Sequence, residues 1–243
     1  MEIYSCWDTW HVADAYHFQN ADFYHGMMSN WKAQNVDGIV AFNYAPAPYS
    51  ELQKLLPEDE IYYSSGDEYY DFYKEFERAE DNTLRACYVA DRRGGYPYLS
   101  GCGGNNVFAP LPTGIPNDET LLDIPVVIEP KYENGRKVSV KLVITNAKKD
   151  CDRFRVFLNG EEIKEFNTDF HYIDSQIFWP ENQPVSLRPS CHSENPSEML
   201  IITAITDSKL LKCGMNTVSV CVVDRRNYMI DSINVEKTEI TII

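Results

Sequence analysis

The chain has 243 residues, of which 44% are hydrophobic and 24% are charged, and this is the composition of a globular protein rather than a disordered one. Its formal net charge is −15, and residues 1–80 alone hold fifteen Asp or Glu against four Lys or Arg. An acidic chain with no basic stripe repels phosphate backbones, so nucleic acid is excluded as an expected partner. No apolar run approaches the roughly 20 residues of a membrane-spanning helix, so no membrane partner is expected.

Seven cysteines are scattered along the chain without any Cys-x-x-Cys pair. The sequence therefore predicts neither a zinc site nor a thioredoxin-type centre, and we expect no metal and no cofactor. An odd number of thiols suits a reducing compartment. The first residues also lack a basic region followed by an apolar stretch, so no signal peptide is expected and a cytoplasmic location is favoured.

The first 80 residues have the pattern of an α/β protein. Residues 2–7 form a short strand-like run, and apolar residues at helical spacing then predict a helix over residues 21–34. Asn35 is expected to end this helix in the left-handed conformation, and His25 is expected on its surface. The apolar run Ile39–Phe42 predicts a strand buried on both faces, as in a parallel sheet. A strand, a helix and a second strand in this order indicate a βαβ unit.

Two further segments precede the β-rich part of the chain. A capping-box pattern at residues 65–68, followed by aromatic residues at helical spacing, predicts a helix over about 67–80. Residues 91–118 are rich in Gly, Pro and Asn, and we interpret residues 85–119 as an ordered connector.

From residue 120 to the end, the pattern is that of an antiparallel β-sandwich. Alternating apolar and polar residues mark several strands, and Asn159-Gly160 between two of them predicts a hairpin turn. The predicted strands are 121–129, 137–145, 153–158, 162–166, 175–179, 198–205, 216–223 and 232–242.

Two stretches near the N-terminus have a recognisable pattern. Phe23-Tyr24-His25-Gly26-Met27-Met28-Ser29-Asn30-Trp31, running into Val36-Asp37-Gly38-Ile39-Val40-Ala41-Phe42-Asn43-Tyr44, resembles the last helix and strand of TIM-barrel glycoside-hydrolase-like proteins of bacteria. In those proteins the final strand follows the pattern GxDGI-x-x-FN, and this chain has Asn35 where that pattern usually has Gly. The resemblance implies a (β/α)-barrel origin for residues 1–84.

Later motifs follow in the order that this resemblance implies. Residues 88–97 with Ala109-Pro110-Leu111-Pro112 are similar to the region that leads from such a barrel into a C-terminal sandwich. Phe157-Leu158-Asn159-Gly160 and Leu211-Lys212-Cys213-Gly214-Met215-Asn216-Thr217-Val218 resemble galactose-binding-type jelly-roll motifs. The implied organisation is residues 1–84 as C-terminal βα units of a TIM-barrel-like domain, 85–119 as connector and 120–243 as a jelly-roll-like sandwich.

The length of the α/β part departs from the family pattern. A complete barrel takes roughly 250 residues, whereas about 80 precede the connector here, which is room for about two βα units. The expected fold is therefore a partial (β/α)-barrel remnant followed by an antiparallel β-sandwich. A partial barrel leaves open strand edges, so self-association through the incomplete barrel is an expected property.

The candidate site lies where the two N-terminal strands end, because barrel enzymes bind substrate at that rim. Asp8 is the candidate catalytic carboxylate, although no second carboxylate at the separation that glycosidases need stands out. The candidate substrate-binding residues are Trp7, Trp10, His11, Asn43 and Tyr44. Tryptophan rings stack on sugar rings, and Asp, His and Asn bond to hydroxyl groups. Equally, both tryptophans could pack under a loop while Asp8 caps a turn.

Two functions stay open at this point. The resemblance implies the C-terminal portion of a glycoside-hydrolase-like protein that acts in carbohydrate processing, binds a carbohydrate ligand and is catalytically incomplete alone. The alternative is a carbohydrate-binding or structural β-sandwich module without catalytic activity. In either reading, Trp179 serves as a core residue of the sandwich or as an exposed stacking platform.

Overall fold

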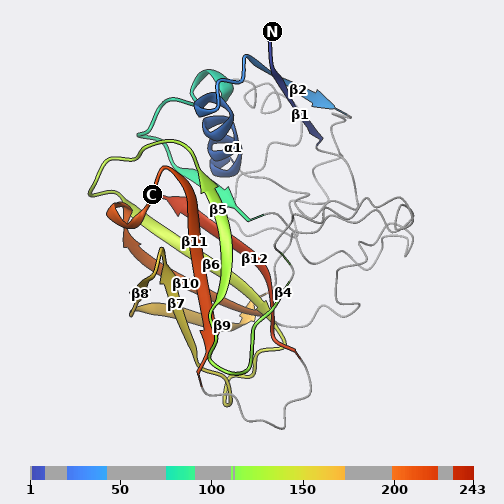
Figure 1. Cartoon of the computed structure of the whole chain (residues 1–243), viewed down its shortest axis with the longest axis vertical. Coiled ribbons are helices and arrows are strands. Elements are labelled where there is room, and N and C mark those ends of the chain that lie inside the picture. The colour runs from blue at the N-terminus through green and yellow to red at the C-terminus, as the bar shows by residue number, and fades with distance from the viewer. Residues whose placement is uncertain are drawn as a thin grey trace.

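The structure is a computed structural model that describes residues 2–8, 21–42, 75–90, 111, 113–172, 199–223 and 232–243. In this part of the chain a small α/β layer lies at one end of a larger antiparallel β-sandwich (Figure 1). None of the described helices is long and apolar enough to cross a membrane.

The α/β layer consists of β1 (Tyr4–Asp8), α1 (Ala21–Ala33) and β2 (Gly38–Phe42). The strands β1 and β2 pair in parallel, which confirms the predicted strand–helix–strand order with a parallel pair. Val40 is 47% exposed, so the prediction that this strand is buried on both faces was wrong. Asn35 has a φ of 60°, so the predicted left-handed end of the helix is also confirmed. The ring of Tyr4 lies against Gly38 on the neighbouring strand, since a Cβ atom on Gly38 would come within 2.6 Å of that ring.

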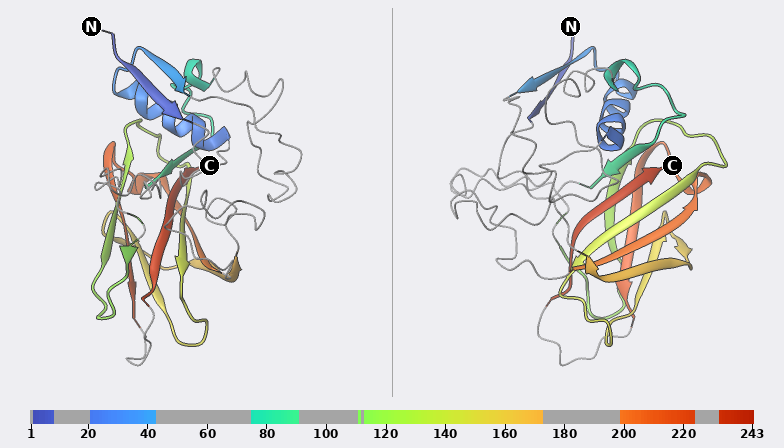
Figure 2. Two further views of the ribbon diagram at one scale, coloured as in Figure 1. Left: turned by 90° about the vertical axis from the view of Figure 1, so that its right-hand side faces the viewer. Right: turned by 180° about the vertical axis from the view of Figure 1, so that it is seen from behind.

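The sandwich consists of two antiparallel sheets that pack face to face (Figure 2). In the larger sheet the order is β3-β12-β6-β10-β9, and β4 also pairs with β12. Its strands are β3 (Ala86–Val89), β4 (Thr113–Gly114), β6 (Lys137–Thr145), β9 (Phe166–Tyr172), β10 (Met199–Asp207) and β12 (Asn234–Ile242). The smaller sheet has the order β5-β11-β7-β8. Its strands are β5 (Leu122–Ile128), β7 (Phe154–Leu158), β8 (Glu161–Ile163) and β11 (Gly214–Val222).

One hydrophobic core fills the space between the two sheets. In β5, Ile124 and Val126 point into the core while Pro125 and Val127 point outward, which is the period of a half-buried strand. Each buried aliphatic side chain of this kind stabilises the fold by about 1.5–3 kcal/mol. Completely buried core residues from both sheets are Ile124, Ile128, Leu142, Ile144, Leu158, Leu200 and Ile202.

Most of the predicted strands are confirmed to within about two residues, and the strand over 137–145 has the predicted bounds. The interval 162–166 differs from the prediction, because β8 ends at Ile163 and β9 begins at Phe166. Residues 175–179 lie outside the described residues. Within the expected connector, residues 86–89 form β3, which pairs with β12. Of the helix predicted over 67–80, the structure describes only residues 75–80, of which 75–77 are helical.

The two jelly-roll-like motifs meet in space. Asn159 and Gly160 both have positive φ, 52° and 88°, and form the predicted hairpin turn between β7 and β8. Asn159 Nδ2 donates to Asn216 Oδ1 at 2.8 Å, and Asn159 Oδ1 accepts from the Thr217 amide at 3.0 Å. Asn216 is completely buried. Its Oδ1 also accepts from the Lys212 amide, and its Nδ2 donates to the Lys212 carbonyl oxygen. These motif residues therefore fasten two turns together.

The Asn216→Ala variant is expected to lower the free energy of unfolding by about 3 kcal/mol, because buried backbone groups and the Asn159 amide lose their partner. Urea unfolding measures the change. Asn167→Ala, at an exposed position on β9, is the matched control and should change stability by about 0.5 kcal/mol or less. Equal effects of the two substitutions would contradict the structural role of Asn216.

Candidate functional site

The strand-end rim predicted from the sequence starts at the end of β1. Trp7 stands opposite Ala41 and Asp8 opposite Phe42, so both parallel strands end at the same edge. Asn43 is the next residue in the sequence after Phe42, the last residue of β2. The structure describes only the backbone of Trp7 and Asp8. Trp10, His11, Asn43 and Tyr44 lie outside the described residues. The side-chain chemistry of this rim stays a prediction.

Helix α1 lies between the parallel strands and the sandwich (Figures 1 and 2). On one side Tyr24 and Met28 pack with Ile39 of β2 and with Ala79. On the other side Gly26 faces β3, and a Cβ atom at this position would lie 2.3 Å from the carbonyl oxygen of Cys87. Only a glycine permits helix and strand to approach this closely.

Asn30 joins α1 to the free edge of β5. Its Nδ2 donates to the Val127 carbonyl at 3.0 Å, and its Oδ1 accepts from the Glu129 amide at 2.9 Å. The side-chain amide thus pairs with the backbone of the edge strand much as a neighbouring strand would. This contact links residues almost 100 positions apart and fixes where the helix lies over the sandwich.

A buried polar cluster holds the segment after residue 74 against α1. His25 Nδ1 lies 3.2 Å from Glu75 Oε2, and its Nε2 lies 3.2 Å from the Asp81 carbonyl oxygen. Arg78 donates to the other oxygen of Glu75 at 2.9 Å. His25 is only 2% exposed, so the expectation of a surface position was wrong. Since both ring nitrogens are engaged and Glu75 is 4% exposed, this histidine–carboxylate pair has the geometry of a structural contact.

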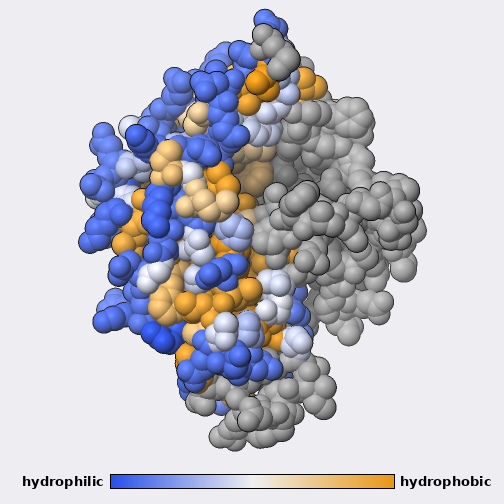
Figure 3. All heavy atoms as spheres, in the orientation of Figure 1, coloured by the Kyte–Doolittle hydropathy of each residue, from blue (hydrophilic) through white to orange (hydrophobic). Residues whose placement is uncertain are grey.

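A groove of about 760 Å³ runs between α1 and the adjoining end of the sandwich. Its lining combines apolar and polar surface, and Asn30 is one of the polar residues. The described residues that line it are Phe23, Met27, Asn30, Trp31, Gln34, Cys87, Tyr88, Val89, Ala90, Pro125, Val127, Glu129 and Met215. Figure 3 shows hydrophobic residues gathered where α1 meets the ends of β5 and β11. Nothing in the sequence pattern pointed to this groove, because four separate segments form it.

Two ionisable groups in the groove are held in their neutral forms. Burial, reinforced by the negative charge of Glu239, raises the pKa of the Cys87 thiol above its usual range. Burial also raises the pKa of the Tyr88 hydroxyl, which is hydrogen-bonded to the hydroxyl of Tyr132. The described lining therefore carries a single charge, the carboxylate of Glu129.

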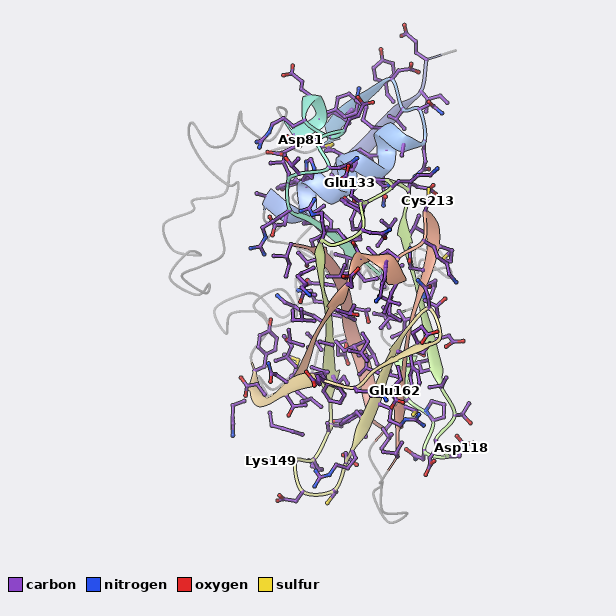
Figure 4. All side chains as sticks on the ribbon, turned by 90° about the vertical axis from the view of Figure 1, so that its left-hand side faces the viewer. Asp81, Asp118, Glu133, Lys149, Glu162 and Cys213 are labelled. Atoms are coloured by element: carbon purple, nitrogen blue, oxygen red, sulfur yellow. The ribbon has the colours of Figure 1, made fainter. Side chains whose placement is uncertain are left out.

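A smaller hollow of about 360 Å³ lies between the β6–β7 loop and β9. It is lined by charges of both signs, namely Lys149 and Arg153 together with Asp150 and Asp169. Figure 4 shows Lys149 and Asp118 at the end of the sandwich away from α1, whereas Cys213 lies at the end next to α1. In the part of the chain that the structure describes, no group of three or more His, Cys, Asp or Glu could hold a metal ion.

Comparison with solved structures gives a weak likeness. No protein-family model matches the chain, and no curated protein does. Among solved structures, it is similar to a β-porphyranase of glycoside hydrolase family 86 from the human gut bacterium Bacteroides plebeius, with 16% sequence identity and a TM-score of 0.35. The match covers 65% of this chain and 20% of that protein. At this TM-score the likeness adds nothing to the choice of a function.

The contact between α1 and β3 generates a testable prediction. Gly26→Ala should improve helix propensity by about 1 kcal/mol, but the new Cβ atom meets the Cys87 carbonyl, so we expect a net loss of stability of about 2 kcal/mol. Chemical unfolding measures this change.

Gly114→Ala is the matched control, because the nearest atom to its Cβ position is 3.5 Å away and the neighbours need not move. If Gly26→Ala is as stable as this control, α1 does not pack on β3 as described.

Proposed function

We propose that this chain is the C-terminal portion of a glycoside-hydrolase-like protein that acts in carbohydrate processing. In this proposal residues 1–84 contribute the last βα units of a (β/α) barrel, and residues 120–243 form a jelly-roll-like sandwich. The observation that carries it is the parallel β1–α1–β2 unit, in which Asp8 and Phe42 end the two strands at one edge, joined to an antiparallel sandwich. The sequence motifs that resemble the family occur in the same order.

The strand-end rim is the proposed substrate site. Asp8 is the proposed catalytic carboxylate, while Trp7, Trp10, His11, Asn43 and Tyr44 are the proposed substrate-binding residues. Glycoside hydrolysis takes two carboxylates about 5–9.5 Å apart, and a barrel supplies them from the ends of different strands. Since β1 and β2 are only two of the eight strands of a barrel, we propose that the chain is catalytically incomplete alone.

The alternative is a non-catalytic carbohydrate-binding or structural module. The observation that favours it is the sandwich core, which is shared by both sheets and is built without any residue of β1, α1 or β2. In this alternative Trp179, which lies outside the described residues, is the proposed stacking platform.

A binding and turnover screen separates these functions. The proposal predicts no hydrolysis of aryl glycosides by the purified chain, together with saturable stabilisation by an oligosaccharide in thermal unfolding. Trp10→Ala should weaken that binding about tenfold, a loss of about 1.4 kcal/mol, because the ring no longer stacks on the sugar. Trp179→Ala should leave the affinity unchanged.

Each other outcome has a defined meaning. Binding that only Trp179→Ala weakens would favour the sandwich module. Hydrolysis that Asp8→Asn abolishes, and that the exposed-loop control Asp118→Asn does not, would show that the chain is catalytically complete. If no sugar is hydrolysed and no sugar stabilises the chain, the proposal is overturned.

A further inference from the structure

We infer that the groove between α1, β3 and the β5–β11 edge binds a neutral saccharide, at a site separate from the strand-end rim. The choice of a saccharide as the ligand class rests on the proposed function. The location and the neutral character of the site rest on the contacts described above.

The walls of the groove offer apolar surface on opposite sides. Phe23 and Trp31 lie along the helix wall, and Val127 and Met215 lie on the strand wall. Val127 is 38% exposed and Met215 is 57% exposed, so both present apolar surface to solvent. Aromatic rings and thioether groups pack well against the C–H faces of pyranose rings. A groove of about 760 Å³ is within the usual range for small-ligand sites.

Polar groups are placed at the margins of the groove. Gln34 is exposed just beyond the C-terminal end of α1, and Glu129 is half-buried at the end of β5. An amide offers a donor and an acceptor to vicinal hydroxyl groups, and a carboxylate accepts two hydrogen bonds. Asn30 has a different role, since its two polar side-chain atoms already bond the β5 backbone and hold α1 against the edge of that strand.

The described lining of the groove offers no positive charge to an anionic ligand. No Lys, Arg or His is among its described lining residues, and Glu129 contributes a negative charge. Cys87 and Tyr88 stay protonated and neutral at physiological pH because burial raises the pKa of each. The chain as a whole carries a formal charge of −15. Phosphorylated, sulfated and uronic-acid ligands are therefore repelled, whereas a neutral sugar is not.

The groove is also formed before a ligand arrives. The Gly26 contact with Cys87 and the Asn30 bonds to β5 fix the separation of its walls. A site of this kind loses little conformational freedom on binding, so modest contacts give measurable affinity.

The test is calorimetric titration of the full chain with neutral tetrasaccharides of glucose, mannose and galactose, alongside a tetrasaccharide of galacturonic acid. At least one neutral tetrasaccharide should bind and the anionic one should not. Gln34→Ala and Met215→Ala change exposed residues and should each weaken binding at least threefold. Trp31→Ala should weaken binding at least tenfold, with its folding checked by thermal unfolding.

The control variant is Ile205→Ala, which replaces another exposed apolar residue, 49% exposed on β10 and outside the groove. Its affinity should equal that of the unmodified chain. Binding that Trp10→Ala abolishes and that Gln34→Ala and Met215→Ala do not change would overturn the groove site while leaving the proposed function in place. Equal binding of the galacturonic acid tetrasaccharide would overturn its neutral character, and no binding by any neutral sugar would overturn both proposals.

Discussion

The packing of helix α1 on the sandwich is the constraint on which the rest of the architecture depends. A two-stranded parallel sheet has too little surface to be stable by itself, so β1 and β2 need the helix beneath them. The helix in turn needs the sandwich, and it is held there by a close approach at Gly26 and by the amide of Asn30 on the β5 edge. Without these contacts the parallel pair would have no fixed relation to the rest of the chain.

The packing of α1 also determines which hydrogen bonds the polar residues near the helix make. The free edge of β5 would expose unpaired backbone groups, and Asn30 satisfies two of them. His25 and Glu75 are buried on the opposite side of the helix, where their contact fixes the segment that leads into β3. The side chains of Asn30, His25 and Glu75 therefore make structural contacts around the helix.

The sandwich could be predicted from sequence because its signals are local. Strand β6 alternates polar and apolar residues from Lys137 to Leu142, and the positive φ that Asn-Gly tolerates marks the hairpin after β7. Strand β9 gave no such signal, since it is an edge strand whose residues are mostly exposed and polar. Strand β3 was not among the predicted strands, because its four residues are too few to show a period.

The strand-end rim and the groove differ in how far each could be predicted from the sequence. The parallel register places Asp8 opposite Phe42 at the end of both strands, whereas the sequence predicted that Asp8 follows the first strand. The groove was not predictable, since Trp31, Tyr88 and Met215 come together only through tertiary packing. His25 was assigned to the surface because helical spacing alone does not show that a second segment, near residue 75, covers that side of the helix.

Amide hydrogen exchange on the purified chain is the most direct test of whether α1 packs stably on the sandwich. The account predicts that amides of residues 21–33 and 38–42 exchange about as slowly as those of β3 and β5, because the helix and both strands open together with the sandwich. Fast exchange over residues 21–42, with slow exchange retained in β6, β10, β11 and β12, would contradict it. In that case the sandwich would be the folded unit, and the α/β layer would not be fixed upon it.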